Sequence, residues 1–283
     1  MLISKLSRLD SPAKAYLTIF RMKAAEGLQY RIAALAGASI SIFWVLIEIV
    51  VYSVFYLHSD NPSAGLMAGL NLEQLVTYIW LAQFLFLMQP MNIDSDILAK
   101  IQNGDVSLDL CRPLNLYHHW FAKVAAGRLI PLLWRGSFIL IAGLLAPRAY
   151  RLGPPASLAG LLCAILSASS AFWLCSAYGT LVCGIRLNIR WGDGPTYIIM
   201  LIGGILSGSY LPLQLWPDVL QPFLLLQPFA GYLDLPLRFY VGTMAPDRIL
   251  WALSLQLSWS ALFILLGKSL MKKKINRLII QGG

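Results

Sequence analysis

The chain has 283 residues, of which 58% are hydrophobic and only 12% are charged, and its mean hydropathy is +0.68. A soluble protein of this length cannot bury so much apolar surface, so lipid must solvate most of the chain. The net charge of +9 does not indicate a nucleic-acid partner, because the basic residues lie between apolar runs and form no single basic surface. The composition therefore predicts an all-α, polytopic membrane protein, with residues 1–283 forming one transmembrane domain in the lipid bilayer.

Residues 1–31 form a basic, amphipathic lead-in to the first apolar run. Apolar side chains recur at helical spacing and polar ones take the opposite face: Leu17, Phe20, Ala24 and Leu28 against Lys14, Thr18 and Arg21. We expect a helix that lies on the inner membrane surface. A helix packed on a soluble partner is the alternative, and it is less favoured because the pattern continues directly into a spanning segment.

Six apolar runs approach the length needed to cross a membrane. A hydrocarbon core of about 30 Å requires about 20 residues of helix. The runs cover residues 32–57, 75–91, 129–146, 156–183, 196–211 and 249–267. The third contains Arg135 and the fifth ends at Pro212, so either is expected to be tilted, broken or partly re-entrant.

The distribution of basic residues predicts the topology. Seventeen of the 22 Lys and Arg residues fall in the lead-in, the 92–128 loop, the loop between the fourth and fifth runs and the 268–283 tail. Short loops rich in Lys and Arg remain in the cytoplasm, so both termini are predicted to be cytoplasmic.

Two ionisable side chains lie inside apolar runs, Glu48 in the first and Arg135 in the third. A charge at the centre of a bilayer costs at least about 2.5–3.5 kcal/mol, so such groups normally face a bundle interior, a cavity or each other. We expect Glu48 and Arg135 to be mutual partners. A structural ion pair, or an Arg135 that extends to the interface, is favoured over a role in substrate passage.

Small residues at four-residue spacing predict close helix packing. They are Gly204 and Gly208 in the fifth run and Gly160, Ala164 and Ala168 in the fourth. The contacts lie either within one chain, which is the more common case, or between two subunits. Residues 212–248 combine a dense apolar sequence with several prolines, so short helices that dip into the outer leaflet are expected there.

Signatures of catalysis and metal binding are not found in the sequence. Before Gly267-Lys268-Ser269, the position that a phosphate-binding loop requires to be glycine is Leu262. A metal site can be assembled on paper from six residues: His118, His119, Asp94, Asp96, Asp105 and Asp109. Adjacent histidines diverge on a helix, however, and these histidines do not have the i, i+4 spacing of a ligand pair. We therefore predict that this chain is not an enzyme and binds no metal or cofactor.

Four stretches match a family pattern in their order and spacing. They are the lead-in ending Tyr30-Arg31, the loop Ile101-Gln102-Asn103-Gly104-Asp105-Val106 followed by Leu110-Cys111-Arg112-Pro113, the segment Pro212-Leu213-Gln214-Leu215-Trp216-Pro217 followed by Pro228 and Pro236, and the tail closing on Gln281-Gly282-Gly283. This order resembles the permease subunits of ABC type-2 exporters, in particular a bacterial six-span branch encoded separately from its ATPase. Arg135 and the pair His118-His119 are not part of that pattern.

The resemblance implies a location in the bacterial inner membrane, an N-terminal elbow helix and a re-entrant hairpin between spans five and six. It also implies partners: P-loop ATPase subunits, which bind ATP and Mg²⁺, and a second permease, identical or related. A coupling helix in the 92–128 loop would dock on the ATPase through Ile101, Gly104, Asp105, Leu110, Arg112 and Pro113. A secondary cytoplasmic contact would involve Arg186, Arg190 and Asp193. An ordinary connecting loop is the alternative for each of these residues.

Two other classes of function stay open. A secondary transporter driven by an ion gradient would use Glu48 and Arg135 as its coupling pair, although no internal repeat supports it. A membrane-embedded enzyme would use the region of Asp94, Asp96 and His118, although the spacing supplies no acid–base or metal constellation. The sequence does not select a substrate, and export as the direction rests on the resemblance.

Overall fold

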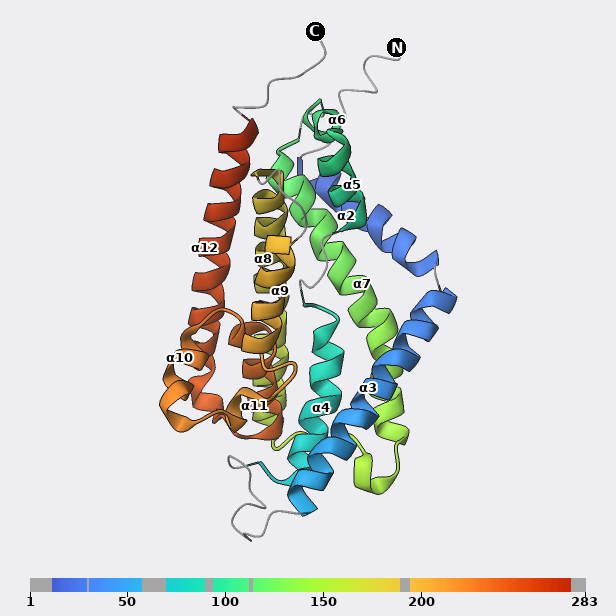
Figure 1. The fold of residues 1–283 in the computed structure, drawn as a ribbon, viewed down its shortest axis with the longest axis vertical. Coiled ribbons are helices and arrows are strands. Elements are labelled where there is room, and N and C mark those ends of the chain that lie inside the picture. The colour runs from blue at the N-terminus through green and yellow to red at the C-terminus, as the bar shows by residue number, and fades with distance from the viewer. Residues whose placement is uncertain are drawn as a thin grey trace.

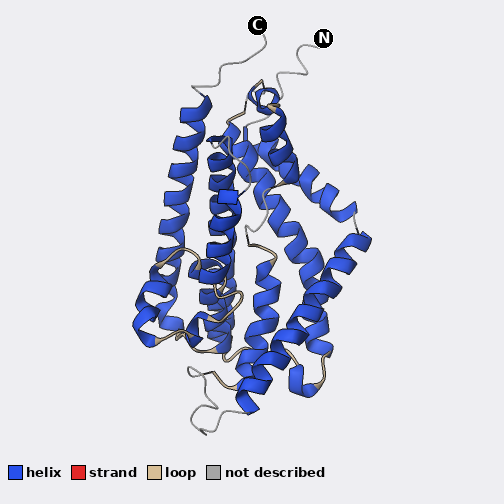
Figure 2. Ribbon diagram, in the orientation of Figure 1, coloured by secondary structure: helices blue, strands red, loops and turns tan. Residues whose placement is uncertain are grey.

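A computed structural model describes residues 12–29, 31–57, 70–89, 94–111, 114–188 and 194–275 of the chain. Every regular element in these ranges is a helix, as expected from the composition (Figure 2). The lead-in contains α2 (Pro12–Gln29), and the chain then turns sharply into α3 (Arg31–Leu57) (Figure 1). The all-α prediction is therefore confirmed over the described residues.

Four helices are long and apolar enough to cross a bilayer: α3, α7 (Leu116–Leu145), α8 (Leu158–Asn188) and α12 (Ile249–Ile275). Two further helices lie where spans two and five were predicted, α4 (Leu72–Phe86) and α9 (Gly194–Leu206). Their 15 and 13 residues correspond to about 20 Å of helix, less than a hydrocarbon core of about 30 Å. The multi-pass architecture is confirmed, and the count of six crossings stays a prediction.

The helix α7 begins at Leu116, well before the predicted start of the third span at residue 129. The 92–128 segment is therefore only partly a loop. Lys123 and Arg128 interrupt the apolar run in the sequence, but both are accommodated by the fold. Lys123 pairs with Asp96, and buried Arg128 donates from Nη1 to the carbonyl of Val124 at 3.0 Å. Their charges therefore do not end the helix.

Short helices fill the region after α9. They are η2 (Leu213–Leu215), η3 (Asp218–Leu220), α10 (Gln221–Leu226), η4 (Ala230–Tyr232), α11 (Asp234–Val241) and η5 (Pro246–Arg248). Nearly all of α11 is buried, and it lies against α8 (Figure 1). An ion pair inside this region, Arg238 Nε to Asp234 Oδ2 at 2.5 Å, is almost completely shielded from solvent. The expected short helices are thus present, and they fold back on the bundle.

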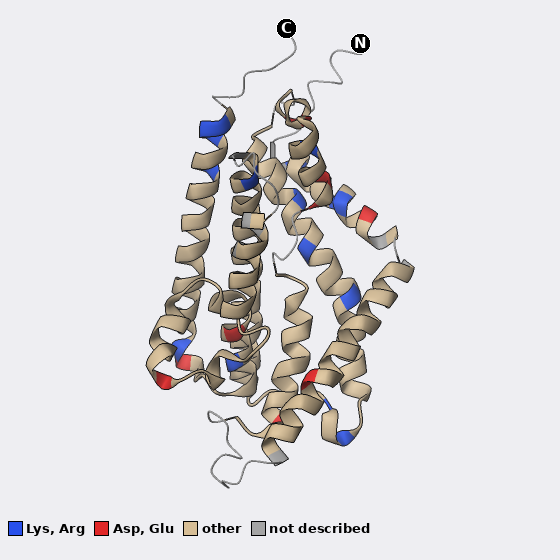
Figure 3. Cartoon of the chain, viewed as in Figure 1, with Lys and Arg blue, Asp and Glu red and all other residues tan. Residues whose placement is uncertain are grey.

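The opposite end of the bundle carries α5 (Ser95–Asn103) and α6 (Val106–Leu110), next to the start of α2 and the basic end of α12 (Figure 1). Lys and Arg residues are found along α2, in α7 and at this end of α12 (Figure 3). The short helix η1 (Arg148–Tyr150) and the helices from α10 to α11 lie toward the other end. The two ends of the bundle therefore differ in charge, as the topology prediction requires.

Candidate functional site

The candidate site is the helical pair α5–α6, which contains most of the predicted coupling residues. Asp94 starts α5, since its carboxylate accepts hydrogen bonds from the backbone N–H groups of Asp96 and Ile97. Gly104 ends α5 with a φ of +80°, a left-handed conformation that favours glycine. The chain then turns directly into α6. The sequence thus builds a compact helix–turn–helix at this end of the bundle.

The inner face of the pair is apolar and packs on the long helices. Ile97 and Val106 are buried, and Ile101 and Leu110 pack against the same cluster from its edge. The other members come from α7, α8 and α12: Leu116, Tyr117, Trp120, Val124, Cys183, Leu187 and Met271. Burying large side chains of this kind stabilises by about 1.5–3 kcal/mol each. The pair is therefore anchored to three spans at once.

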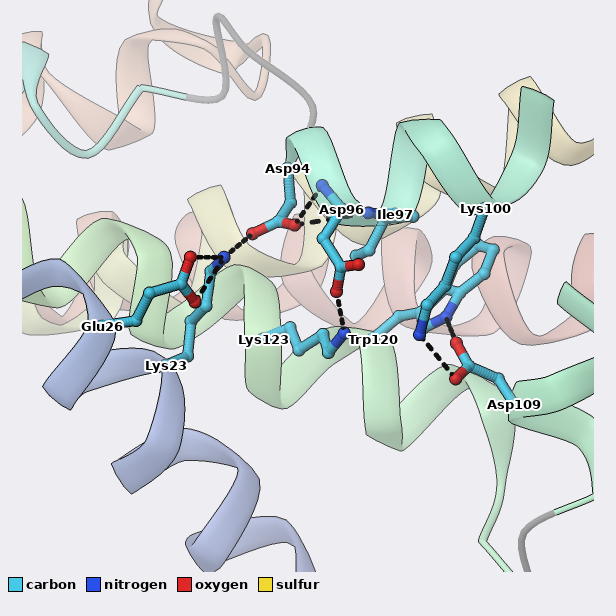
Figure 4. Close-up of polar contacts among 9 residues, drawn as sticks. All are labelled: Lys23, Glu26, Asp94, Asp96, Ile97, Lys100, Asp109, Trp120 and Lys123. Carbon is cyan, nitrogen blue, oxygen red and sulfur yellow. Dashed lines mark hydrogen bonds and ion pairs between the residues drawn. The ribbon is translucent and has the colours of Figure 1, made fainter. Parts of the chain in front are cut away.

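Charged contacts fix the pair at its edges (Figure 4). Lys100 Nζ lies 2.8 Å from Asp109 Oδ1, and Trp120 Nε1 donates to Asp109 Oδ2 at 3.2 Å. Burial opposes the charged form of Asp109, but these two hydrogen bonds outweigh it and lower the pKa of Asp109 below its ordinary value. A hydrogen bond from Lys123 likewise lowers the pKa of Asp96. Both carboxylates are therefore ionised and held in place at neutral pH.

The lead-in helix α2 belongs to the same assembly. Lys23 lies 3.2 Å from Asp94 Oδ2 and 3.1 Å from Glu26 Oε2 (Figure 4). Burial opposes the charge of Lys23, but Asp94 and Glu26 outweigh it and raise the pKa of Lys23. The Tyr16 hydroxyl accepts a hydrogen bond from the Asn115 backbone N–H at 3.2 Å. The helix α2 is thus fixed to both α5 and α7.

The outer face of the pair is exposed, and it contains Gly104, Asp105 and Leu108. Leu108 is 62% exposed, so this large apolar side chain is accessible from outside the pair. Of the predicted coupling residues, Gly104 and Asp105 lie on this face, whereas Ile101 and Leu110 are half-buried; Arg112 and Pro113 lie outside the described residues. We call Gln102, Gly104, Asp105 and Leu108 the coupling surface, after the role that the family resemblance predicts for this loop; that role stays a prediction.

Leu108 was not among the predicted residues, although helical spacing contains the signal. Val106 and Leu110 are four residues apart, so they share one face of α6 and leave Leu108 on the opposite face. The second predicted contact has less support. Arg186 is buried near the end of α8, so its side chain is not on the surface, and Arg190 and Asp193 lie outside the described residues.

The two intramembrane charges do not form the expected pair. Arg135 Nη2 donates to Ser41 Oγ of α3 at 2.5 Å, and no ion pair joins it to Glu48 among the described residues. Gly37 makes this contact possible, because a Cβ there would lie only 3.0 Å from the Arg135 guanidinium. Glu48 is half-buried, two helical turns beyond Ser41. The partner of Arg135 is thus the Ser41 hydroxyl, and the expected pairing with the Glu48 carboxylate is wrong.

The predicted packing residues fall into two groups. Gly160 and Ala164 of α8 do pack closely, but against α11. Gly204 is buried in α9, but Gly208 lies after the end of that helix with a φ of +84°. Gly204 and Gly208 therefore do not form one face of a helix, and the interpretation of Gly208 as a helix-packing residue is wrong. Its role is to reverse the chain beside Tyr78 and Leu213.

The Gly160→Ala variant is expected to lose about 1–3 kcal/mol of the free energy of unfolding, because the new Cβ would lie 2.7 Å from the Phe239 carbonyl oxygen. Denaturation of the purified protein in mixed micelles measures the change. Gly194→Ala is the matched control, since a Cβ there meets no atom within 4 Å. Equal stability of the two variants would contradict a close contact between α8 and α11.

The residues of the alternative enzyme site are engaged elsewhere. Asp94 and Asp96 are bound by lysines, and the His118 ring lies edge-on to Tyr16, with ring centroids 5.7 Å apart. Over the described ranges, no three His, Cys, Asp or Glu side chains are placed to hold a metal ion. These contacts support mechanical attachment of α5 and α6 to the bundle.

One comparison with known proteins is informative. A family model described as an ABC-2 family transporter protein matches residues 42–282. Searches of curated proteins and of solved structures find no match. The matched segment includes the second half of α3, the coupling surface and the region from α9 to α12. The chain therefore belongs to the ABC-2 transporter family and is a multi-pass transport permease.

Proposed function

We propose that this permease is the membrane subunit of an ATP-driven ABC exporter. It forms the translocation pathway with a second permease and docks through its coupling surface on separate P-loop ATPase subunits, which bind ATP and Mg²⁺. The location is the bacterial inner membrane, with both termini cytoplasmic. The observation that carries the proposal is the exposed Leu108, held on a helical pair that is anchored to three spans.

The construction of this site suits the transmission of force. An apolar side chain can seat in a partner's groove while Asp105 and Gln102, both exposed, provide polar contacts around it. Because α5 and α6 pack on α7, α8 and α12, a displacement of the pair must move these helices or break the cluster. Closure of the ATPases on ATP would thus reorient the spans as rigid bodies.

The finer architecture follows the same proposal. The helix α2 acts as the elbow helix, α4 and α9 complete six crossings, and the region from η2 to α11 is the re-entrant hairpin. The sharp turn between α2 and α3 and the return of α11 along α8 support these assignments. The two short helices can cross where the surrounding protein, rather than lipid, covers their ends.

Purification of the tagged chain from its native membrane in mild detergent tests the proposal. A P-loop ATPase is expected to co-purify in stoichiometric amount, and transport in vesicles is expected to require ATP. Two results together would contradict the proposal: the chain purifies alone, and transport persists in ATP-depleted vesicles under an ion gradient.

A gradient-driven transporter is the second candidate, and Glu48 favours it. This carboxylate is half-buried inside a span and has no ion-pair partner among the described residues. Glu48→Gln separates the candidates. In an ATP-driven permease the variant is expected to transport at the normal rate per folded molecule, whereas loss of transport at normal membrane abundance supports the gradient mechanism.

A further inference from the structure

Two cavities meet at the N-terminal turn of α7. The first is an open apolar groove of about 690 Å³ between α2, α7 and α8. Its walls are largely aromatic, with Tyr16 and Phe20 on one side and Phe121, Phe172 and Trp173 on the other. The second is a pocket of about 460 Å³ between α7 and the end of α12, lined by Asn115, Lys268 and Lys272. His118 lines both cavities, so they lie next to each other at this residue.

The depth of the two cavities matches one leaflet of a bilayer. Lys268 lies 19 residues after the start of α12, which corresponds to about 28 Å of helix, close to the thickness of the hydrocarbon core of about 30 Å. The basic pocket therefore lies at the level of the lipid headgroups. The groove extends along α7 from His118 to Leu129, about 16 Å, toward the bilayer centre. The length of the groove is thus comparable to one leaflet with its headgroup region, which measures about 20 Å.

The chemistry of the two cavities is complementary to one kind of molecule. Lys268 and Lys272 are one helical turn apart on the same face of α12, and both line this pocket, where Lys268 Nζ lies 5.7 Å from the centroid of the Tyr117 ring. No described carboxylate lines the pocket or the groove. A positive headgroup pocket beside an apolar, aromatic groove fits an anionic headgroup that carries an acyl chain.

We propose that this permease binds one anionic phospholipid, with its phosphate on Lys268 and Lys272 and an acyl chain in the groove between α2, α7 and α8. The lipid would contact the elbow helix and the base of α7 at once. This site goes beyond the proposed coupling to an ATPase and does not depend on it, because it requires only that the helices span a membrane.

Fluorescence quenching tests the site in the purified full-length chain. The probe is phosphatidylglycerol with brominated acyl chains, added to micelles that contain phosphatidylcholine. Trp173 lines the groove and is 53% exposed, so a lipid bound there can quench its fluorescence. The part of the quenching that is lost in the Trp173→Phe variant therefore reports on the groove. We expect saturable quenching by brominated phosphatidylglycerol and at least about tenfold weaker quenching by brominated phosphatidylcholine.

Two variants and a matched control complete the test. The double variant Lys268→Gln/Lys272→Gln is expected to raise the half-quenching concentration about tenfold or more. Lys273→Gln/Lys274→Gln removes the same charge from the same end of α12, outside the pocket, and is expected to change nothing. Ala122→Phe fills the groove and is expected to abolish the Trp173 signal.

Three results would overturn the proposal. Equal quenching by the two brominated lipids means that Trp173 reports only on bulk lipid. Equal effects of the two double lysine variants mean that the pocket does not select the headgroup. Reversal of the quenching by glycerol 3-phosphate alone means that the ligand is a free phosphate ester and not a lipid.

Discussion

Asp234→Ala is expected to reduce the free energy of unfolding by about 3–5 kcal/mol, because it leaves the Arg238 guanidinium buried without its carboxylate. Asp234 is fully buried and Arg238 is only 8% exposed. The Tyr78 hydroxyl of α4 also donates to Asp234 Oδ1 at 3.0 Å, and Arg238 Nη2 donates to Gln221 at 3.2 Å. Asp234 and its partner Arg238 thus connect α4, α10 and α11, and loss of the carboxylate is expected to release the whole region between η2 and η5.

Denaturation in mixed micelles measures the effect, with Asp218→Ala as the control. Asp218 is an exposed acidic residue in the same region, and its removal is expected to cost less than about 0.5 kcal/mol. The double variant Asp234→Leu/Arg238→Met removes both charges and is expected to recover most of the stability. If Asp234→Ala unfolds like the control, the network does not hold this end of the protein together.

Leu108→Glu is expected to abolish the capture of an ATPase by the permease. Leu108 is the large apolar side chain of the coupling surface, and its burial in a partner's groove is worth about 1.5–3 kcal/mol. Its loss alone weakens binding about 10- to 150-fold, and the new carboxylate adds the cost of burying an unpaired charge. The fraction of ATPase that stays with the tagged permease through purification measures the change.

Val219→Glu is the matched control for this variant. Val219 is 89% exposed in η3, at the opposite end of the bundle, so the same type of change there is expected to leave the ATPase bound. Because Leu108 is already exposed in the isolated chain, Leu108→Glu is not expected to lower stability. Normal ATPase capture by Leu108→Glu would show that the coupling surface is placed wrongly.

Much of the fold could be predicted from hydrophobic periodicity alone. The helix α3 ends at the predicted Leu57 and α12 begins at the predicted Ile249, because each boundary coincides with a change from lipid-compatible to polar sequence. The start of α7 could not be predicted in this way. In the sequence, Lys123 and Arg128 interrupt the apolar run and suggest that no span begins before them. In the structure, Lys123 pairs with Asp96 and Arg128 donates to the Val124 carbonyl of its own helix, so α7 continues through both positions.

The polar contacts inside the bundle were the least predictable feature. The sequence offers Glu48 as the natural partner of Arg135, but it contains no information on which face of α3 meets α7. The absence of a side chain at Gly37 decides this, since it lets the Arg135 guanidinium reach Ser41. The coupling role of the candidate site stays a prediction. A glycine at position 104 suits the left-handed turn between α5 and α6, whereas the anchoring of these helices on three spans requires tertiary structure.

The most direct test of the coupling account is site-specific photo-crosslinking in the native membrane. A photoreactive amino acid replaces Leu108 in one strain and Val219 in another, and the adducts are identified by mass spectrometry. The account predicts an adduct between a P-loop ATPase and position 108, and none from position 219. An ATPase adduct from position 219, or the absence of one from position 108 and from the neighbouring positions 102 and 105, would contradict it.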